Sequence, residues 1–386
     1  MDIFNDIRPY NDNEVADVIK ALLENDEFFT AISGFQFPRF NKLAPRISKK
    51  VIRKALTKKL TGIDTVAKFQ DIISGYVAKV VKKSSTGVSV SGLNDLSKDK
   101  SYLFISNHRD IALDPALISY LLHREKHGTI EIAIGDNLLK KPFISDLMRL
   151  NRSFLVKRSV QGREKLLASN TLSQYIHTAV EGGNNVWIAQ REGRAKNGID
   201  VTDPTVIKML YMGKRDEDPR PSLQEAINGL HIIPVSISYE YDPCDRDKAK
   251  ELYEVETNGS FTKSEKSDIS SIAKGIEGFK GEMHLSFGAE INAIDSNAAS
   301  IAGLIDEQII TNYKLHSSNY LAYEKLQKEN NSIGPDLNLL GVNIKKINAA
   351  REEFEKRLQS LDQELKSYFL NMYAAPVISK FQFQKN

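Results

Sequence analysis

A histidine lies close to two aspartates in residues 101–117, whose sequence is SYLFISNHRDIALDPAL. His108 is followed by Asp110 and Asp114, and a proline comes directly after Asp114. A carboxylate that hydrogen-bonds one imidazole nitrogen fixes the tautomer of the ring, so the other nitrogen can accept a proton from a substrate. The spacing therefore predicts a general base, His108, assisted by one of the two aspartates.

The residues around this histidine predict where it lies in the fold. Residues 102–106 form a short apolar run typical of a buried strand, and Asp114 followed by Pro115 is typical of a helix start. Open α/β folds place their binding and catalytic groups at the carboxyl ends of strands. Taken by itself, His108 has a simpler interpretation as a solvated loop residue.

The same segment has a misleading likeness to the catalytic loop of protein kinases, because it contains the letters HRD. A kinase carries asparagine five residues after that aspartate, where this chain has Pro115. No glycine-rich phosphate loop precedes the segment. These differences exclude a protein kinase.

Basic residues follow a second predicted strand in residues 153–159, SFLVKRS. Lys157 and Arg158 leave the strand end together, and they point to opposite faces if the strand continues. Only one of them is then expected to face a site. A solvated strand end is the alternative interpretation.

A third segment, residues 186–198 with the sequence VWIAQREGRAKNG, joins an apolar strand to a charged loop. The loop contains Glu192, Gly193, Arg194 and Lys196. Glycine lets a backbone approach a ligand closely, and the guanidinium group matches the geometry of phosphate. The composition suits a phosphate site, although for this loop taken by itself a solvated turn is the favoured interpretation.

Four segments in order resemble the glycerolipid acyltransferase superfamily, which contains the glycerol-3-phosphate and lysophosphatidate acyltransferases. FISNHR at 104–109 looks like the catalytic block, and FLVKRS at 154–159 is similar to the second block. EGRAKNG at 192–198 resembles the phosphate-binding block, and IPVSISYE at 233–240 looks like the fourth. The resemblance covers about residues 86–290.

The chain departs from the family pattern at two places. In the family four residues separate the histidine from its aspartate, whereas here five separate His108 from Asp114 and one separates it from Asp110. Asp114 is favoured because it keeps the family's place at a helix start, and Asp110 is the rival. The third block is one residue short between Gly193 and Arg194, which weakens the carry-over onto that arginine.

The resemblance implies transfer of a fatty acyl group from a thioester to a hydroxyl of glycerol 3-phosphate or lysophosphatidate in phospholipid biosynthesis. His108 would be the general base. Arg194, with Lys196 and one of Lys157 or Arg158, would hold the acceptor's phosphate. No cofactor or metal is implied, since the donor is an acyl-coenzyme A or acyl carrier protein thioester that acts as substrate.

Two alternatives to this function stay open at the level of sequence. One is O-acylation of a lyso-aminolipid, such as a lyso-ornithine or lyso-glycine lipid. The other is a non-catalytic relative that binds a lipid or an acyl carrier protein, which the altered aspartate spacing favours.

The composition is ordinary for a globular protein of 386 residues, with 41% hydrophobic and 27% charged residues. The single cysteine, Cys244, excludes an internal disulfide framework and fits a reducing cytoplasm. The acidic N-terminus has no signal-peptide pattern, and no apolar stretch reaches the ~18 residues of a membrane span. We therefore expect a cytoplasmic protein, with any membrane contact peripheral on the inner face.

Apolar runs alternate with helical periodicity in the middle of the chain. We expect an α/β fold with a mostly parallel sheet flanked by helices. The predicted domains are a helical N-terminal region, residues 1–85, an acyltransferase α/β domain, residues 86–297, and a C-terminal helical region, residues 298–386. Strands are predicted at 88–93, 102–106, 131–134, 154–157, 186–190, 232–239 and 283–287.

Residues 31–60 contain nine Lys or Arg and no Asp or Glu, although the net charge of the whole chain is only +3. A basic amphipathic helix is predicted at 47–60, with Val51, Ile52, Leu56 and Leu60 on one side. It could lie on an anionic membrane surface, receive an acidic protein such as acyl carrier protein, or be solvated. Nucleic acid is not expected, because no binding motif is present.

Three further segments carry predictions of structure. Residues 13–30 read as one amphipathic helix, and residues 240–268 as a polar excursion with little core. Residues 352–370 show heptad-like apolar spacing, which predicts one helix that packs on the main domain or forms a dimerising coil.

Overall fold

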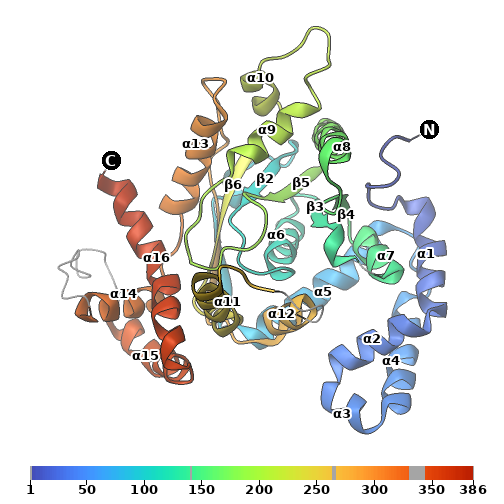
Figure 1. The fold of residues 1–386 in the computed structure, drawn as a ribbon. Helices are drawn as coiled ribbons and strands as arrows, with labels where there is room; N and C mark the ends of the chain where they lie inside the picture. Colours follow the sequence, from blue (N-terminus) through green and yellow to red (C-terminus); the bar gives the residue numbers. More distant parts are fainter. Residues whose placement is uncertain (1, 140, 263–266, 330–343, 386) are drawn as a thin grey trace.

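The computed structural model describes residues 2–139, 141–262, 267–329 and 344–385. In this part of the chain seven strands form one sheet, in the order β1-β7-β6-β2-β5-β3-β4. Every neighbouring pair is parallel except β6 and β7, so β1 and β7 run opposite to the other five strands. Helices cover both faces of the sheet (Figure 1). The predicted α/β fold is confirmed.

Each observed strand falls where an apolar run predicts one, within a few residues. The strands are β1 Gly87–Ser91, β2 Leu103–Ser106, β3 Ile130–Gly135, β4 Ser153–Val156, β5 Asn185–Ala189, β6 Ile232–Tyr239 and β7 Glu282–Phe287. A continuous apolar run is the pattern of a strand that is buried on both faces. Leu103, Phe104 and Ile105 of the central strand β2 are fully buried, as that pattern requires.

The strand β2 carries the His108 segment into the middle of the sheet. Its two neighbours, β5 and β6, are both parallel to it, so the carboxyl ends of all three strands meet at one edge. In Figure 1 the helix α10 (Leu223–Asn228), which precedes β6, lies at the top, and α11 (Asp245–Asn258), which follows it, lies at the bottom. The edge that holds His108 is therefore the lower one.

The helices between the strands hold the sheet on both faces. They are α6 Leu113–Arg124, α7 Pro142–Leu150, α8 Gly162–Glu181, α9 Pro204–Met212 and α12 Ser267–Glu277, with short 3-10 turns at Leu93–Asp95 and Asp136–Leu138. One face of the sheet packs on α8, α9 and α13 (Ala298–Thr311), and the other packs on α5 (Val66–Ser84) and α6. No helix in the described residues combines the length and the hydropathy that a bilayer-spanning segment needs.

The N-terminal helices differ from the prediction in where they break. The single helix predicted at 13–30 is wrong, because α1 (Asp12–Glu24) and α2 (Asp26–Gln36) are separated at Asn25. The side chain of Asn25 accepts a hydrogen bond from the backbone N–H of Phe28, so it caps α2. The apolar periodicity continues through this cap and hides it.

The helix α3 (Pro38–Leu43) starts at a proline, and α4 (Pro45–Leu60) does the same. Ile52 and Leu60 of α4 are buried, as predicted, in an apolar cluster with residues of α1, α2, α5 and α7, which we call the N-terminal cluster. Val51 was predicted on that buried side, which is wrong, because 52% of it is exposed.

The C-terminal helices α14 (Ser317–Glu329), α15 (Ile344–Gln359) and α16 (Lys366–Lys385) form a separate apolar cluster with α11. The excursion predicted at 240–268 is thus wrong where α11 packs into that cluster, with Ala249 fully buried. A single helix over 352–370 is also wrong, since the chain turns between Gln359 and Lys366. Its heptad-like side chains are buried inside this cluster and are not free to form a dimerising coil.

Two helical glycines provide a test of this packing. A Cβ atom on Gly303 of α13 would meet no atom within 4 Å, whereas one on Gly275 of α12 would lie 1.9 Å from Oδ2 of Asp110. We expect Gly303→Ala to raise the free energy of unfolding by about 0.5–1 kcal/mol through helix propensity. Gly275→Ala should lower it by about 1–3 kcal/mol through overpacking. Urea denaturation measures both, and a Gly275→Ala variant as stable as the wild type would contradict the position of Asp110.

Candidate active site

His108 and Asp114 form a hydrogen-bonded pair at the carboxyl end of β2. The Nδ1 atom of His108 lies 2.8 Å from Oδ2 of Asp114. The Asp114 side chain is completely buried, and 15% of the His108 side chain is exposed. A neutral imidazole in this position carries its proton on Nδ1, which leaves the lone pair of Nε2 available to a substrate. This geometry is suited to general-base chemistry.

The Asp114 carboxylate is held by three further donors. Its Oδ2 accepts the backbone N–H groups of Arg109, at 2.6 Å, and of Asp110, at 2.9 Å. Its Oδ1 accepts the hydroxyl of Tyr239, at the end of β6, at 2.6 Å. Burial raises the pKa of the Tyr239 hydroxyl well above its ordinary value, and the charge of Asp114 adds to this effect. The tyrosine therefore stays a donor to the carboxylate.

Asp110, the rival partner, has a different set of contacts. Its Oδ1 accepts the backbone N–H groups of Ala112, at 3.0 Å, and Leu113, at 2.8 Å, so the side chain supports the start of α6. Burial raises the pKa of the Asp110 carboxyl, and the charge of Asp114 raises it further. The structure thus places Asp114 at the imidazole and Asp110 at the helix start.

Asn107 and Trp187, two residues that sequence reasoning did not single out, position the histidine loop. Asn107 exchanges hydrogen bonds with the backbone of Ile237, through Oδ1 at 2.7 Å and Nδ2 at 3.0 Å. Trp187 of β5 packs edge to face against His108, with ring centroids 5.7 Å apart, and its Nε1 donates to Ser106. Both residues stand inside or beside the quoted motifs, which is the one signal that could have pointed to them.

Buried polar contacts connect the loop after β5 to the histidine loop. Arg109 pairs with Asp200 at 2.6 Å, with both side chains almost fully buried. Asp200 also accepts a hydrogen bond from Asn107, at 3.0 Å. The backbone N–H of Ala195 donates to the carbonyl oxygen of His108 at 2.8 Å. The predicted phosphate loop is therefore fixed relative to His108.

The basic residues predicted to bind phosphate separate into different environments. Arg194 is half-buried, and its Nη1 is inaccessible to solvent without a hydrogen-bond partner in the described residues. Lys196 is already paired with Glu251 of α11, at 2.6 Å. Burial acts to raise the pKa of the Asp242 carboxyl, but the neighbouring Lys248, with a smaller part from Arg194, holds that pKa below its ordinary value. Arg194 thus lies on the inner side of its loop.

The remaining predicted residues lie in exposed positions. Arg158 and Glu192 approach each other, with Nη1 and Oε1 3.8 Å apart, and 72% of the Glu192 side chain is exposed. Lys157 is also exposed, at the end of β4. Gly193 has a φ of +77°, a conformation that favours glycine, and its Cα faces open space. The structure thus brings the second and third segments together through Arg158 and Glu192.

The C-terminal helices close the site beside Arg109. Lys248 of α11 donates to the carbonyl oxygen of Arg109 at 2.8 Å and pairs with Asp242. Tyr373 of α16 accepts the backbone N–H of Asp242 at 2.8 Å. A small cavity lies between these groups, lined by Arg109, Ala195, Tyr239, Asp242, Lys248, Tyr313, Asn319, Met372, Tyr373 and Pro376. In the described residues no cluster of three or more His, Cys, Asp or Glu is arranged to hold a metal ion.

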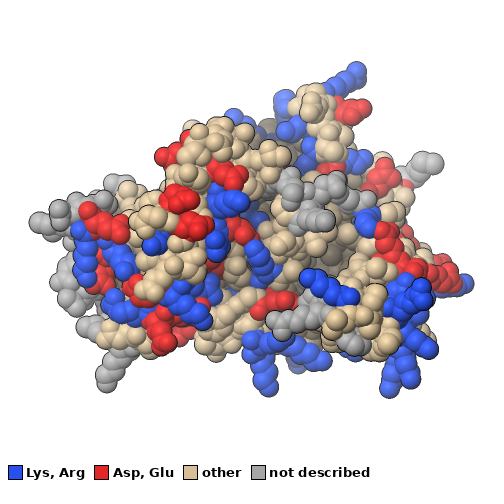
Figure 2. All heavy atoms as spheres, turned by 60° about the horizontal axis from the view of Figure 1, so that its bottom comes forward, with Lys and Arg blue, Asp and Glu red and all other residues tan. Residues whose placement is uncertain are grey.

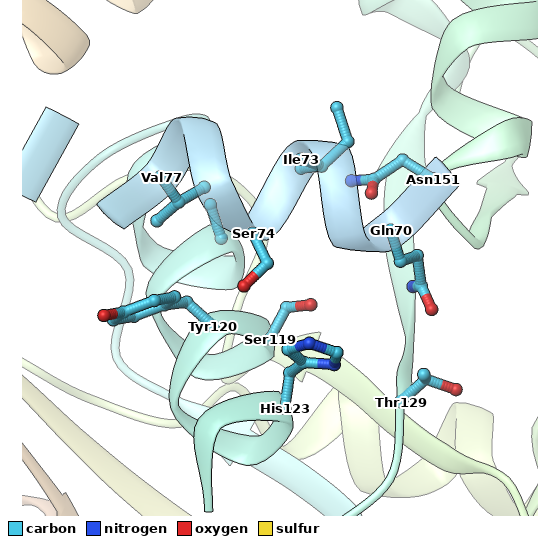
Figure 3. Close-up of a pocket in the computed structure, with 10 residues that line it drawn as sticks. Gln70, Ile73, Ser74, Val77, Ser119, Tyr120, His123, Thr129 and Asn151 are labelled. Carbon is cyan, nitrogen blue, oxygen red and sulfur yellow. The ribbon is translucent and has the colours of Figure 1, made fainter. Parts of the chain in front are cut away.

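A second pocket lies between α5 and α6, away from His108 (Figure 3). Gln70 and Ser74 reach it from α5, and Ser119 and His123 reach it from α6. His123 is about two and a half turns beyond Asp114 on α6, on the order of 13 Å along the helix axis. None of the predicted site residues lines this pocket.

Comparisons with known proteins agree with this arrangement. A family model described as Acyltransferase matches residues 87–238. A glycerol-3-phosphate acyltransferase from Hamiltonella defensa subsp. Acyrthosiphon pisum (strain 5AT) is 28% identical over 144 residues, which are 37% of this chain and 16% of that protein. In this region the chain is similar to the glycerolipid acyltransferase superfamily. The resemblance stated from the motifs is confirmed.

A dihydroxyacetone phosphate acyltransferase from Bos taurus is a second relative, 23% identical over 244 residues. That alignment covers 61% of this chain and 34% of the bovine protein. The chain thus spans well under half the length of either curated acyltransferase. The crystal structure of a 1-acyl-sn-glycerophosphate (LPA) acyltransferase from Thermotoga maritima matches with a TM-score of 0.36 and 13% identity, over 76% of this chain and 95% of that one. This last likeness is too distant to carry an argument.

The buried pair of Arg109 and Asp200 generates a prediction about stability. Burial raises the pKa of the Asp200 carboxyl, and the charge of Arg109 opposes this. Asp200→Asn leaves the guanidinium buried without an ionised partner, so we expect a loss of about 3–5 kcal/mol in the free energy of unfolding. Glu181→Gln, which breaks an exposed pair with Lys214, should change it by less than about 1 kcal/mol. Equal effects of the two variants in urea denaturation would refute this account.

Proposed function

We propose that this chain transfers a fatty acyl group from an acyl thioester to a hydroxyl of glycerol 3-phosphate or lysophosphatidate. The observation that carries the proposal is the His108–Asp114 pair at the carboxyl end of the central strand, in which Asp114 occupies Nδ1 and leaves Nε2 for a substrate. Both curated relatives are named for acceptors that carry a phosphate, which supports an acceptor of this class.

In the proposed reaction Nε2 of His108 takes the proton of the acceptor hydroxyl as its oxygen attacks the thioester carbonyl. Asp114 holds the ring and stabilises the imidazolium that forms. When the carbon–sulfur bond breaks, the thiolate leaves and recovers the proton from the imidazolium. The products are an ester and a free thiol, so the step needs no acyl-enzyme and no further reactant.

Arg194 is the first residue that we assign to the acceptor's phosphate. Its Nη1 is buried without a partner in the described residues, and a buried donor of this kind is costly unless an acceptor satisfies it. Arg158 and Lys157, which are both exposed, would approach the phosphate from the solvent side. We expect a smaller part for Lys196, because Glu251 already neutralises it. A phosphate fixed in this way would position the hydroxyl near His108.

The decisive experiment is thiol release from an acyl thioester by the purified protein. We expect release that depends on the acceptor and falls to background in His108→Gln. Parallel reactions with glycerol 3-phosphate, dihydroxyacetone phosphate, lysophosphatidate and a lyso-ornithine lipid identify the acceptor class. Donors of both kinds, acyl-coenzyme A and acyl carrier protein, are compared in the same assay.

The outcomes of that assay separate the candidate functions. Release with the lyso-ornithine lipid alone would replace the phosphate acceptor by an aminolipid. No release with any acceptor or donor, from a protein that is folded by circular dichroism, would overturn the enzymatic proposal and favour a binding protein.

The two aspartates provide a matched pair of variants. Asp114→Asn should reduce kcat by about 10²–10⁴-fold, because the imidazolium loses its negatively charged partner. Asp110→Asn should leave kcat within about tenfold of wild type, because an amide oxygen can still accept the helix-start N–H groups. Steady-state kinetics with saturating acceptor measure both values. The reverse order of effects would make Asp110 the partner of His108.

A further inference from the structure

The outward face of α4 carries apolar and basic side chains together. Ile47 and Val51 are 59% and 52% exposed, and Leu43 at the end of α3 is 86% exposed. Exposed apolar side chains that are clustered, rather than scattered singly, commonly mark an interaction site. We call this surface the α4 outer face, and it consists of Leu43, Ile47, Lys50, Val51, Lys54 and Lys58.

Helix geometry explains why these side chains share one face. Successive residues of an α-helix are about 100° apart, so positions 47, 50, 51, 54 and 58 fall within roughly 100° of one another around α4. Ile52 and Leu60 point the opposite way and pack in the N-terminal cluster. The apolar residues of the outer face therefore do not contribute to the core.

The structure divides the basic residues of α4 into two groups. Lys49 and Arg53 turn toward α2, where both pair with Asp26. Lys50, Lys54 and Lys58 are exposed, and no ion pair is found for them within the described residues. The positive charge of the outer face is thus available to a partner, whereas that of Lys49 and Arg53 is used within the helical region.

The helix α4 lies on the same side of the molecule as the catalytic edge. In Figure 1 the helices α2, α3 and α4 extend toward the bottom, the direction in which the carboxyl ends of β2 and β6 point. Figure 2 turns this side forward and shows blue side chains projecting at the lower right, where Figure 1 has α4. A flat partner that touches α4 would therefore also face the His108 end of the sheet.

We propose that the α4 outer face docks the protein on an anionic lipid bilayer. Lipid phosphates would pair with Lys50, Lys54 and Lys58, and the acyl-chain boundary would take up Leu43, Ile47 and Val51. An acidic protein would satisfy the lysines by charge alone, but the bilayer also accounts for the apolar side chains that stand between them. The inference deepens the proposed function, because it places the membrane at the side where a lipid product would leave.

The test uses full-length protein and flotation with vesicles of phosphatidylcholine alone or phosphatidylcholine with phosphatidylglycerol. We expect binding only to the anionic vesicles, weakened about tenfold or more when Lys50, Lys54 and Lys58 are all changed to glutamine. The matched charge control changes Lys98, Lys208 and Arg215 to glutamine, three exposed cations outside this face. It should stay within about twofold of wild type, because it removes the same net charge elsewhere.

A second set of variants tests the contribution of the apolar side chains to vesicle binding. Ile47→Ser with Val51→Ser should weaken binding even in high salt, where charge attraction is screened. Leu166→Ser with Leu167→Ser, at 62% and 59% exposed positions on α8, is the matched control. Equal losses in the test and control variants would overturn the proposal. It would also be overturned if the α4 variants kept vesicle binding and lost only binding of acyl carrier protein.

Failure of this inference can be told apart from failure of the proposed reaction. The α4 variants should keep thiol release with a water-soluble short-chain thioester and glycerol 3-phosphate, because they do not touch His108. Conversely, His108→Gln should bind anionic vesicles as well as the wild type does. A loss of soluble-substrate activity in the α4 variants would assign the face to the catalytic site instead of the membrane.

Discussion

The hydrogen bonds accepted by the Asp114 carboxylate are the constraint on which the site depends. A fully buried carboxylate is costly unless donors surround it, and here the four donors come from the histidine ring, two backbone N–H groups and Tyr239. These donors belong to the turn after β2 and to the end of β6. The same contacts that satisfy the charge therefore fix two strands and the start of α6 relative to one another.

The residues next to the His108–Asp114 pair are held by a buried ionic and polar network. Arg109 and Asp200 form a buried ion pair, and Asn107 links both the β6 backbone and Asp200. Such a network specifies one arrangement of the loops, because each polar atom is costly in any other. The loop that carries the imidazole is also linked to α11, because Lys248 donates a hydrogen bond to the carbonyl oxygen of Arg109.

The sequence predicts those parts of the fold that depend on local pattern. Short apolar runs locate the strands, and the motif that contains His108 and Asp114 locates the pair. The breaks at Asn25 and after Gln359 are hidden, because apolar periodicity continues across a cap or a turn. The contacts of Trp187 and Asp200 are hidden as well, since they depend on which distant strands become neighbours.

Counting charged residues in the sequence does not show which of them are paired within the fold. The phosphate loop and α4 are both rich in basic residues, yet in each case part of the charge is used inside the fold. Lys196 is neutralised by Glu251, and Lys49 and Arg53 by Asp26, whereas Arg194 keeps a donor without a partner in the described residues. Only the three-dimensional arrangement separates cations that stabilise the chain from cations that can meet a ligand.

The pairing of β1 with β7 has a consequence for how the chain is made. Ser89 and His284, which face each other across this pairing, are 195 residues apart. At ordinary rates of synthesis, β1 leaves the ribosome roughly 10 to 40 s before its partner strand exists. Val88 and Val90 pack against the apolar cluster to which the partner strand contributes Met283, Leu285 and Phe287. The nascent chain must therefore carry this strand without its partner through about half of translation, a natural point for chaperone binding or for aggregation.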